Sequence, residues 1–251
     1  MDTFCAHPDR SKRPRERGLF TASFISYCPT RRSLLQGLSA MLCGMSSAAM
    51  ASSFDEFFRA IASDSPRTLQ SLANRGFDLN TRNEKSDPPL VLALRLDALK
   101  VVDFLLTRPD VDVEARTPQD ESALMLAALK GRLAQCEALI RRKAHVNKPG
   151  WTPLHYAASH PGEAAPAVVE LLLEHHAYID ATSPNGSTPL MLAAMYGNTQ
   201  VVAQLLEAGA DASLKNEQGM TAVDFAHRAG RPAEAERIAR SIRGRSSKGS
   251  W

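Results

Sequence analysis

The chain has 251 residues, of which 44% are apolar, 23% are charged and 6% are aromatic, which excludes a protein that is disordered throughout. Seven of the 30 basic residues but only three of the 27 acidic ones precede Ser52, so the remainder carries 23 basic and 24 acidic residues. A nucleic-acid-binding face needs clustered lysine and arginine, so this near balance argues against nucleic acid as a partner.

Residues 1–51 differ from the rest of the chain in their excess of basic over acidic residues. The arginine pair Arg31 and Arg32 lies in the stretch Thr30-Arg31-Arg32-Ser33-Leu34-Leu35-Gln36. This stretch resembles the twin-arginine (Tat) signal motif, with leucine in the place of phenylalanine and glutamine in the place of lysine. The resemblance implies a bacterial protein that is folded before it is exported to the periplasm.

The residues after the arginine pair complete the signal. The run from Leu34 to Met50 is moderately apolar, and it is too short and too rich in glycine and serine for a membrane span. Ala49 and Ala51 form the small-x-small pattern of a signal-peptidase site, so we expect the mature protein to begin at Ser52. A mitochondrial transit peptide and an unprocessed leader of a cytoplasmic protein remain as alternatives.

The cysteines add little chemistry. Cys5, Cys28 and Cys43 fall in the leader, so Cys136 has no partner for a disulfide in the rest of the chain. The residues around Cys43 make a poor lipobox, and we therefore expect no stable membrane anchor. Cys136 falls in an apolar helical stretch, where a small buried residue is expected rather than a redox group.

Beyond the leader, one short motif recurs five times at a nearly constant interval. Its copies begin at residues 88, 122, 152, 188 and 221, and the best of them is Thr152-Pro153-Leu154-His155-Tyr156-Ala157-Ala158. A second apolar helical segment follows, as in Val201-Val202-Ala203-Gln204-Leu205-Leu206 before Gly209-Ala210-Asp211. Threonine can cap a helix whose first residue is proline, and glycine fits the left-handed turn that ends one. The pattern therefore predicts that each unit forms a pair of helices.

The motif T-P-L-H-x-A with a period near 33 residues, and the closing segment V-x-x-L-L-x-x-G-A-D, resemble the ankyrin repeat. Counting back from residue 88 places a degenerate first unit near Asp55, so the units start near residues 55, 88, 122, 152, 188 and 221. The resemblance implies an all-α repeat solenoid of about six helix-turn-helix units with short β-hairpin fingers. We expect it to span residues 52–243, followed by a flexible tail over 244–251.

Two neighbouring irregularities interrupt the period. The interval falls to 30 residues before Trp151 because the stretch from Lys143 is about three residues short, so the finger ending at Gly150 should be stubby. Within the next unit, residues 160–166 lengthen the connection between the two helices by about three residues.

The sequence contains none of the common catalytic or cofactor-binding motifs considered for it. It contains no G-x-S-x-G, no phosphate-binding loop and no H-E-x-x-H, so we expect no enzyme, no cofactor and no metal. His175 and His176 are adjacent on a helix and point about 100° apart, so they cannot easily share an ion with His160.

The resemblance also implies that the concave side, made of finger tips and first helices, binds a protein partner. On that side the repeat frame places large apolar residues and their neighbours, which are Leu129, Lys130, Trp151, His160, Met195, Tyr196 and Met220. Exposed Trp and Tyr are typical anchors of protein interfaces. The alternative is that the short finger shifts the register and turns these residues into the core.

Three functions stay open. The first is a monomeric, non-enzymatic scaffold that binds a protein in the periplasm. The second is a secreted or cytosolic effector that binds a host protein. The third is an accessory of a periplasmic redox enzyme that holds metal or haem near His160, His175 and His176.

Overall fold

The computed structural model describes residues 52–246, with side chains described over 52–243, and these residues contain helices and turns but no strand. The predicted export signal and residues 247–251 lie outside the described residues. In chain order the helices are residues 52–62, α2 (Pro66–Asn74), α3 (Pro89–Arg95), α4 (Leu99–Thr107), α5 (Ala123–Leu129), α6 (Leu133–Arg141), α7 (Pro153–Ala158), α8 (Ala165–Glu174), α9 (Pro189–Tyr196), α10 (Thr199–Glu207), α11 (Ala222–Arg228) and α12 (Pro232–Ser246).

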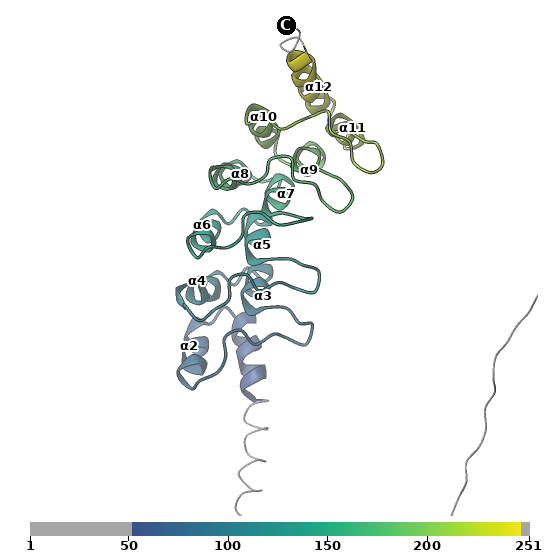
Figure 1. Ribbon diagram of the computed structural model, residues 1–251. Coiled ribbons are helices and arrows are strands. Elements are labelled where there is room, and N and C mark those ends of the chain that lie inside the picture. The colour runs from purple at the N-terminus through teal and green to yellow at the C-terminus, as the bar shows by residue number, and fades with distance from the viewer. Residues whose placement is uncertain (1–51, 247–251) are drawn as a thin grey trace, which may run out of the picture. The chain divides into compact units, whose positions relative to one another are not determined.

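These helices form two stacked rows, with a finger extending from the row of first helices at each step (Figure 1). In one row, α3, α5, α7, α9 and α11 each pack against the next, and in the other row α2, α4, α6, α8, α10 and α12 do the same. The predicted all-α repeat solenoid is confirmed. We call the face made by the fingers and the exposed sides of the first helices the inner face.

Threonine and serine caps fix where most first helices begin. The side chains of Ser122, Thr152, Thr188 and Thr221 each accept a hydrogen bond from the backbone N–H three residues later, at 3.3 to 3.4 Å. Two of these helices start with proline, whose missing N–H costs nothing at the first helical position. The residue at which each of these helices begins is therefore determined by the motif of its own unit.

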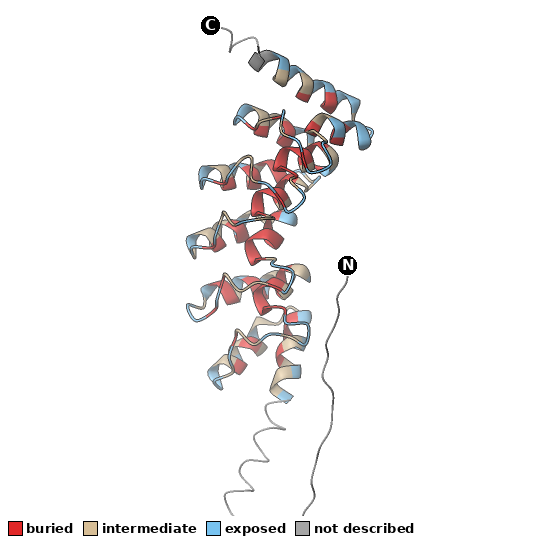
Figure 2. Ribbon diagram, turned by 45° about the vertical axis from the view of Figure 1, so that its right-hand side comes forward, coloured by how far each residue is buried: buried red, intermediate tan, exposed pale blue. Residues whose placement is uncertain are grey.

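The core runs without interruption through the array. Figure 2 shows the buried residues as a band along the stacked helices, with loops and helix ends exposed. The paired alanines of the motif are fully buried, which lets neighbouring first helices pack closely. Leu154, Leu190 and Leu205 are also fully buried and fill the space between units. Each unit thus covers the apolar face of the next.

The fingers are tight turns rather than paired strands. In four of them a backbone N–H donates to the carbonyl four residues later, as from Asn83 to Asp87 (3.2 Å) and from Ser183 to Ser187 (3.0 Å). No strand follows on either side of these bonds within the described residues. In the shortened finger, the Lys148 Nζ atom donates instead to the Trp151 carbonyl oxygen at 3.1 Å.

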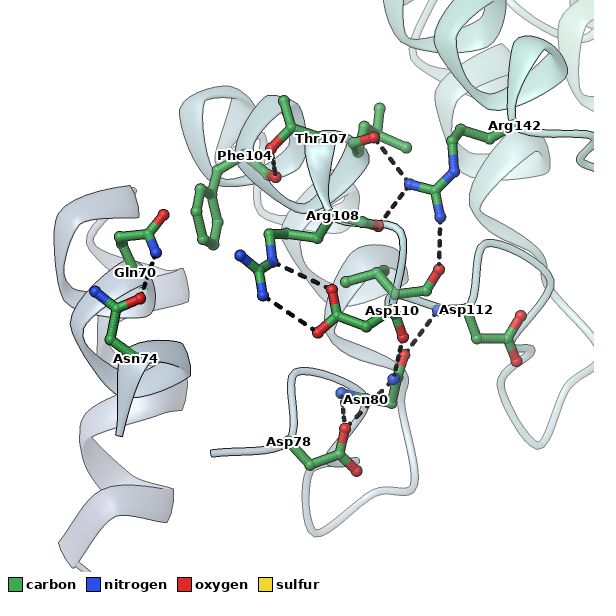
Figure 3. A network of polar contacts seen from close by, with 12 residues as sticks. Gln70, Asn74, Asp78, Asn80, Phe104, Thr107, Arg108, Asp110, Asp112 and Arg142 are labelled. Carbon is green, nitrogen blue, oxygen red and sulfur yellow. Dashed lines mark hydrogen bonds and ion pairs between the residues drawn. The ribbon is translucent and has the colours of Figure 1, made fainter. Parts of the chain in front are cut away.

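Polar contacts between successive units brace the side of the array away from the inner face. Arg142, at the end of α6, donates to the carbonyl oxygens of Leu106, Arg108 and Val111 at 2.8, 2.8 and 2.9 Å (Figure 3). The last carbonyls of a helix have no partner within it, so this arginine satisfies groups at the end of α4. Asn80 makes a similar link, donating to the Asp110 carbonyl and accepting from the Asp112 N–H.

The lengthened connection lies where the sequence places it. Six residues, 159–164, separate α7 from α8, whereas three residues separate α5 from α6. His160 occupies this connection, and its ring packs against Gly131 and Gly162, where a Cβ would lie 2.7 and 2.6 Å from its Nε2 atom. The insertion is therefore packed against the preceding unit.

Candidate functional site

A hollow of about 560 Å³ opens on the inner face between α5, α7 and α9. Three residues predicted from the sequence line it: Leu129 at the end of α5, Trp151 in the short finger and Tyr196 at the end of α9. Leu129 is 38% exposed and Tyr196 is 55% exposed, while Trp151 is half-buried. The remaining lining comes from His155, Tyr156, Ser159, Pro161 and Leu192.

The floor of this hollow is built around His155. The Trp151 ring meets the His155 ring edge-on, with 5.4 Å between ring centroids. The Nδ1 atom of His155 accepts from Thr152, whose Oγ1 lies 2.8 Å away, and its Nε2 donates to the Ser187 carbonyl at 3.0 Å. Burial lowers the pKa of His155, so the imidazole is neutral at pH 7 and adds no charge to the hollow.

The wall on the side of α9 depends on a close approach between helices. A Cβ at Gly197 would overlap the carbonyl oxygen of Ala158, so no other residue fits there without a shift. This contact brings the end of α9, and Tyr196 with it, against the end of α7. The hollow is therefore a product of packing between successive units.

A polar ridge forms the rim toward the N-terminal units. The Tyr156 hydroxyl donates to Glu121 Oε1 at 3.3 Å, and the Glu121 Oε2 atom lies 2.8 Å from Arg95 Nη2. Arg95 also contacts Asp87, with 3.0 Å between Nη1 and Oδ2. Burial and then Glu121 raise the pKa of Tyr156 to about 12, so its hydroxyl stays protonated and keeps donating.

The other predicted binding residues lie outside the lining of this hollow. Lys130 is held by the Asp97 carboxylate at 2.9 Å and by the Arg95 carbonyl at 3.1 Å. His160 packs against the preceding unit. Met195 and Met220 are half-buried and pack against the core. The register shift that would bury the whole set does not occur, but these two methionines are partly drawn inward.

Tyr156 and Leu192 also line the hollow, although they were not among the residues predicted from the sequence. Both occupy the x position of T-P-L-H-x-A, between the buried histidine position and the first alanine. The frame used for prediction took only the finger tip and the residues after the second alanine. A large residue at x, next to a Trp at the finger tip, is the signal that would have found them.

A second hollow of about 540 Å³ lies toward the N-terminal end of the inner face. Phe54 and Phe58 of the first helix line it together with Leu92 and Leu96, and Leu96 is 50% exposed. Its wall also includes Arg95, so the polar ridge at Glu121 connects the two hollows. None of the residues predicted to bind a partner lines this second hollow.

Residues 52–246 do not bring a set of potential metal ligands together. No group of three or more His, Cys, Asp or Glu residues in this range could hold a metal ion. His160 precedes α8 whereas His175 and His176 follow it, which separates them by about 15 Å of helix. Burial raises the pKa of the Cys136 thiol to about 12, so it is not a nucleophile at neutral pH. Within the same range no helix has the length and apolarity that a bilayer span requires.

The stability of the array should fall as the pH drops below 6.5, the ordinary pKa of histidine. Burial lowers the pKa of His155 and His160 in the folded chain, so the unfolded chain takes up protons first. Stability is complete above pH 6.5 and is lost as the pH falls toward the lowered values. Urea unfolding between pH 7.5 and pH 5 measures the free energy of unfolding, which should depend less steeply on pH in the His155→Gln variant. His227→Gln is the control, because His227 is exposed. An unchanged pH dependence in His155→Gln would contradict a role for His155 in the loss of stability.

A family model described as ankyrin repeats (3 copies) matches residues 57–147, 99–183 and 163–239. The chain is 32% identical over 151 residues to the ankyrin repeat protein YahD of Escherichia coli (strain K12), a match that covers 57% of this chain and 73% of YahD. It is 31% identical over 159 residues to the human SH3 and multiple ankyrin repeat domains protein 2, covering 62% of this chain but only 8% of that protein.

One similar solved structure is a complex of a predatory endopeptidase from Bdellovibrio bacteriovorus with an immunity protein. The matched chain of that complex is 27% identical, with a TM-score of 0.64, and the match covers 74% of this chain and 97% of that one.

Proposed function

This chain belongs to the ankyrin-repeat family, and from that premise we propose that it is a non-enzymatic scaffold that binds a protein partner on its inner face. The contact centres on the hollow lined by Trp151, Tyr156 and Tyr196. In this proposal the array binds its partner without catalysing a reaction, and any catalytic activity belongs to the partner.

The observation that carries this proposal is the exposure of large apolar side chains around one hollow. Tyr196 and Leu129 are 55% and 38% exposed, and the fold does not require either of them to face water. Contiguous exposed apolar surface on a soluble protein marks interaction sites, and Trp and Tyr are enriched among the residues that dominate binding energy. The polar ridge at Glu121 supplies the charged rim that such interfaces have.

Affinity capture from an extract of the source cells tests the proposal. The full chain and its Tyr196→Ala variant serve as baits, with Tyr178→Ala as a matched control because Tyr178 is 67% exposed but does not line the hollow. A partner that is retained by the full chain and by Tyr178→Ala, but lost with Tyr196→Ala, supports binding at the hollow. Equal retention by all three baits would place the interface elsewhere.

We further propose that the protein works in the bacterial periplasm after export by the twin-arginine route. The support is the stretch around Arg31 and Arg32 together with Ala49 and Ala51. An array whose units bury their faces only against each other suits a route that carries folded proteins.

Replacing Arg31 and Arg32 by lysine should keep the chain in the cytoplasm, because the Tat receptor reads the guanidinium pair. Fractionation with intact-mass measurement of the exported species checks this, and the expected mature chain begins at Ser52. Arg13→Lys with Arg15→Lys, in the same leader, is the matched control and should be exported normally. A cytoplasmic wild-type chain that retains residues 1–51 would refute export and favour a cytosolic effector.

The similarity to the endopeptidase and immunity protein complex favours a second, narrower candidate: the partner is a peptidase that this chain restrains. The match covers 97% of the chain in that complex, so the likeness extends over a whole folded unit. If the candidate is right, a captured partner should have peptidase activity that the full chain inhibits and Tyr196→Ala does not. A partner without peptidase activity would dismiss this candidate and leave the scaffold function intact.

A further inference from the structure

We propose that the hollow receives an arginine side chain of the partner, held between aromatic walls and the Glu121 carboxylate. This inference rests on the proposed function and deepens it, because it names the chemistry of the bound segment. The partner presents an arginine flanked by apolar residues.

The walls suit a guanidinium group. Trp151, Tyr156 and Tyr196 approach the same hollow from the short finger, from α7 and from the end of α9. A cation is attracted to the negative face of an aromatic ring, and the planar guanidinium of arginine also stacks on such rings. Leu129, Pro161 and Leu192 complete the lining and offer apolar surface to the methylene stem of the same side chain.

Glu121 supplies the complementary charge. The Tyr156 hydroxyl, in the lining, donates to Glu121 Oε1, and the other carboxylate oxygen faces Arg95. Arg95 is shared between Glu121 and Asp87, so these three groups carry one negative charge in excess. Polarisation through the hydrogen bond makes the Tyr156 ring richer in electrons, which strengthens its attraction for a cation.

The cations near the hollow are already engaged by carboxylates. Lys148 contacts Asp120, and the side chain of this lysine is only 4% exposed. Lys130 shares the Asp97 carboxylate with Arg132. His155, on the floor, is neutral and has both ring nitrogens engaged. A positive group of the partner therefore meets aromatic side chains and the Glu121 carboxylate, whose Oε2 atom already pairs with Arg95.

The volume indicates a segment rather than a single ion. At about 560 Å³ the hollow is in the range of sites that enclose small ligands, and it exceeds what one arginine side chain fills. Apolar neighbours of the arginine would occupy the rest, against the leucines. This distinguishes the expected occupant from a highly charged peptide.

Short peptides that differ only in one charge test the inference. The probes are acetyl-Leu-Arg-Leu-amide and acetyl-Leu-citrulline-Leu-amide, because citrulline has the shape of arginine without its charge. Trp151 reports binding by fluorescence in the full chain carrying Trp251→Phe, which removes the only other tryptophan. The arginine peptide should bind roughly fivefold more tightly or better, with the preference weakening in 0.5 M salt.

Two substitutions isolate the role of the carboxylate. Glu121→Gln keeps the shape of the rim and should reduce the preference for arginine over citrulline toward unity, and Tyr156→Phe should reduce it in part. Glu217→Gln is the matched control, since Glu217 is an exposed carboxylate in another finger and does not line the hollow.

Equal binding of the two peptides by the unaltered hollow, or binding of neither, would overturn the arginine proposal. The scaffold function is tested separately, by loss of the captured partner with Tyr196→Ala. A partner lost with Tyr196→Ala but unaffected by Glu121→Gln would show an apolar anchor at the same site, so the two failures can be told apart.

Discussion

Truncation of Tyr196 to alanine is expected to weaken partner binding by about 2 kcal/mol or more, roughly a 30-fold loss of affinity, on the scale of interface hot spots. The side chain is 55% exposed at the end of α9 and lines the hollow, so its ring is free to be buried by a partner. Folding makes little use of an exposed ring, and the thermal midpoint should therefore hardly change. Calorimetric titration of the captured partner, with thermal melts of both proteins, measures the two effects.

Tyr196 is a cleaner site for this test than Trp151. Trp151 is half-buried and meets His155 edge-on, so its truncation should cost both affinity and stability. Tyr178→Ala provides the comparison, because it removes the same ring from an exposed site outside the hollow. A Tyr196→Ala variant that loses stability but keeps its affinity would mean that the ring belongs to the fold and that the partner uses another surface.

Leu205→Ala is expected to destabilise the array by about 2–5 kcal/mol, the range for a buried leucine whose removal leaves a cavity. Leu205 is fully buried in α10, which packs against α8 and α12 in its own row and against α9 in the other row. Thr188→Ala should cost only about 1 kcal/mol, because it removes a single cap whose Oγ1 accepts from the Met191 N–H at 3.4 Å. Chemical denaturation followed by circular dichroism gives both values.

Leu96→Ala is the control for the leucine, since this side chain is 50% exposed and its loss should change stability by less than about 0.5 kcal/mol. The order Leu205, Thr188, Leu96 is the prediction. A larger loss at Thr188 than at Leu205 would contradict the register of the fifth unit.

Much of the fold is readable from the sequence because its determinants are local and repeated. Thr152 and Thr188 cap the helices that their own motifs begin, and Pro153 and Pro189 stand at the first helical position. Within the same motif, the Thr152 Oγ1 atom lies 2.8 Å from the His155 Nδ1 atom. The fingers differ from the expected β-hairpins in detail, because a single backbone bond closes each of four turns and no strand ladder follows within the described residues.

The candidate site was only partly predictable. The repeat frame placed Leu129, Trp151 and Tyr196 outward, and all three line the hollow. The same frame gave Met195 and Met220 equal weight, yet both pack partly against the core, because a long flexible side chain can fold back from an outward position.

The sequence by itself determined the repeat, the starts of the first helices and the candidate residues, since each depends on contacts within one motif or on its period. Only the tertiary structure decided which of them form one site. Tyr196 and Tyr156 line the same hollow because Gly197 lets α9 approach the carbonyl of Ala158, and Glu121 contacts the Tyr156 hydroxyl from the preceding finger. Such contacts depend on how the units stack, and the sequence of one motif does not specify that stacking. The hollow and its charged rim therefore follow only from the packed structure.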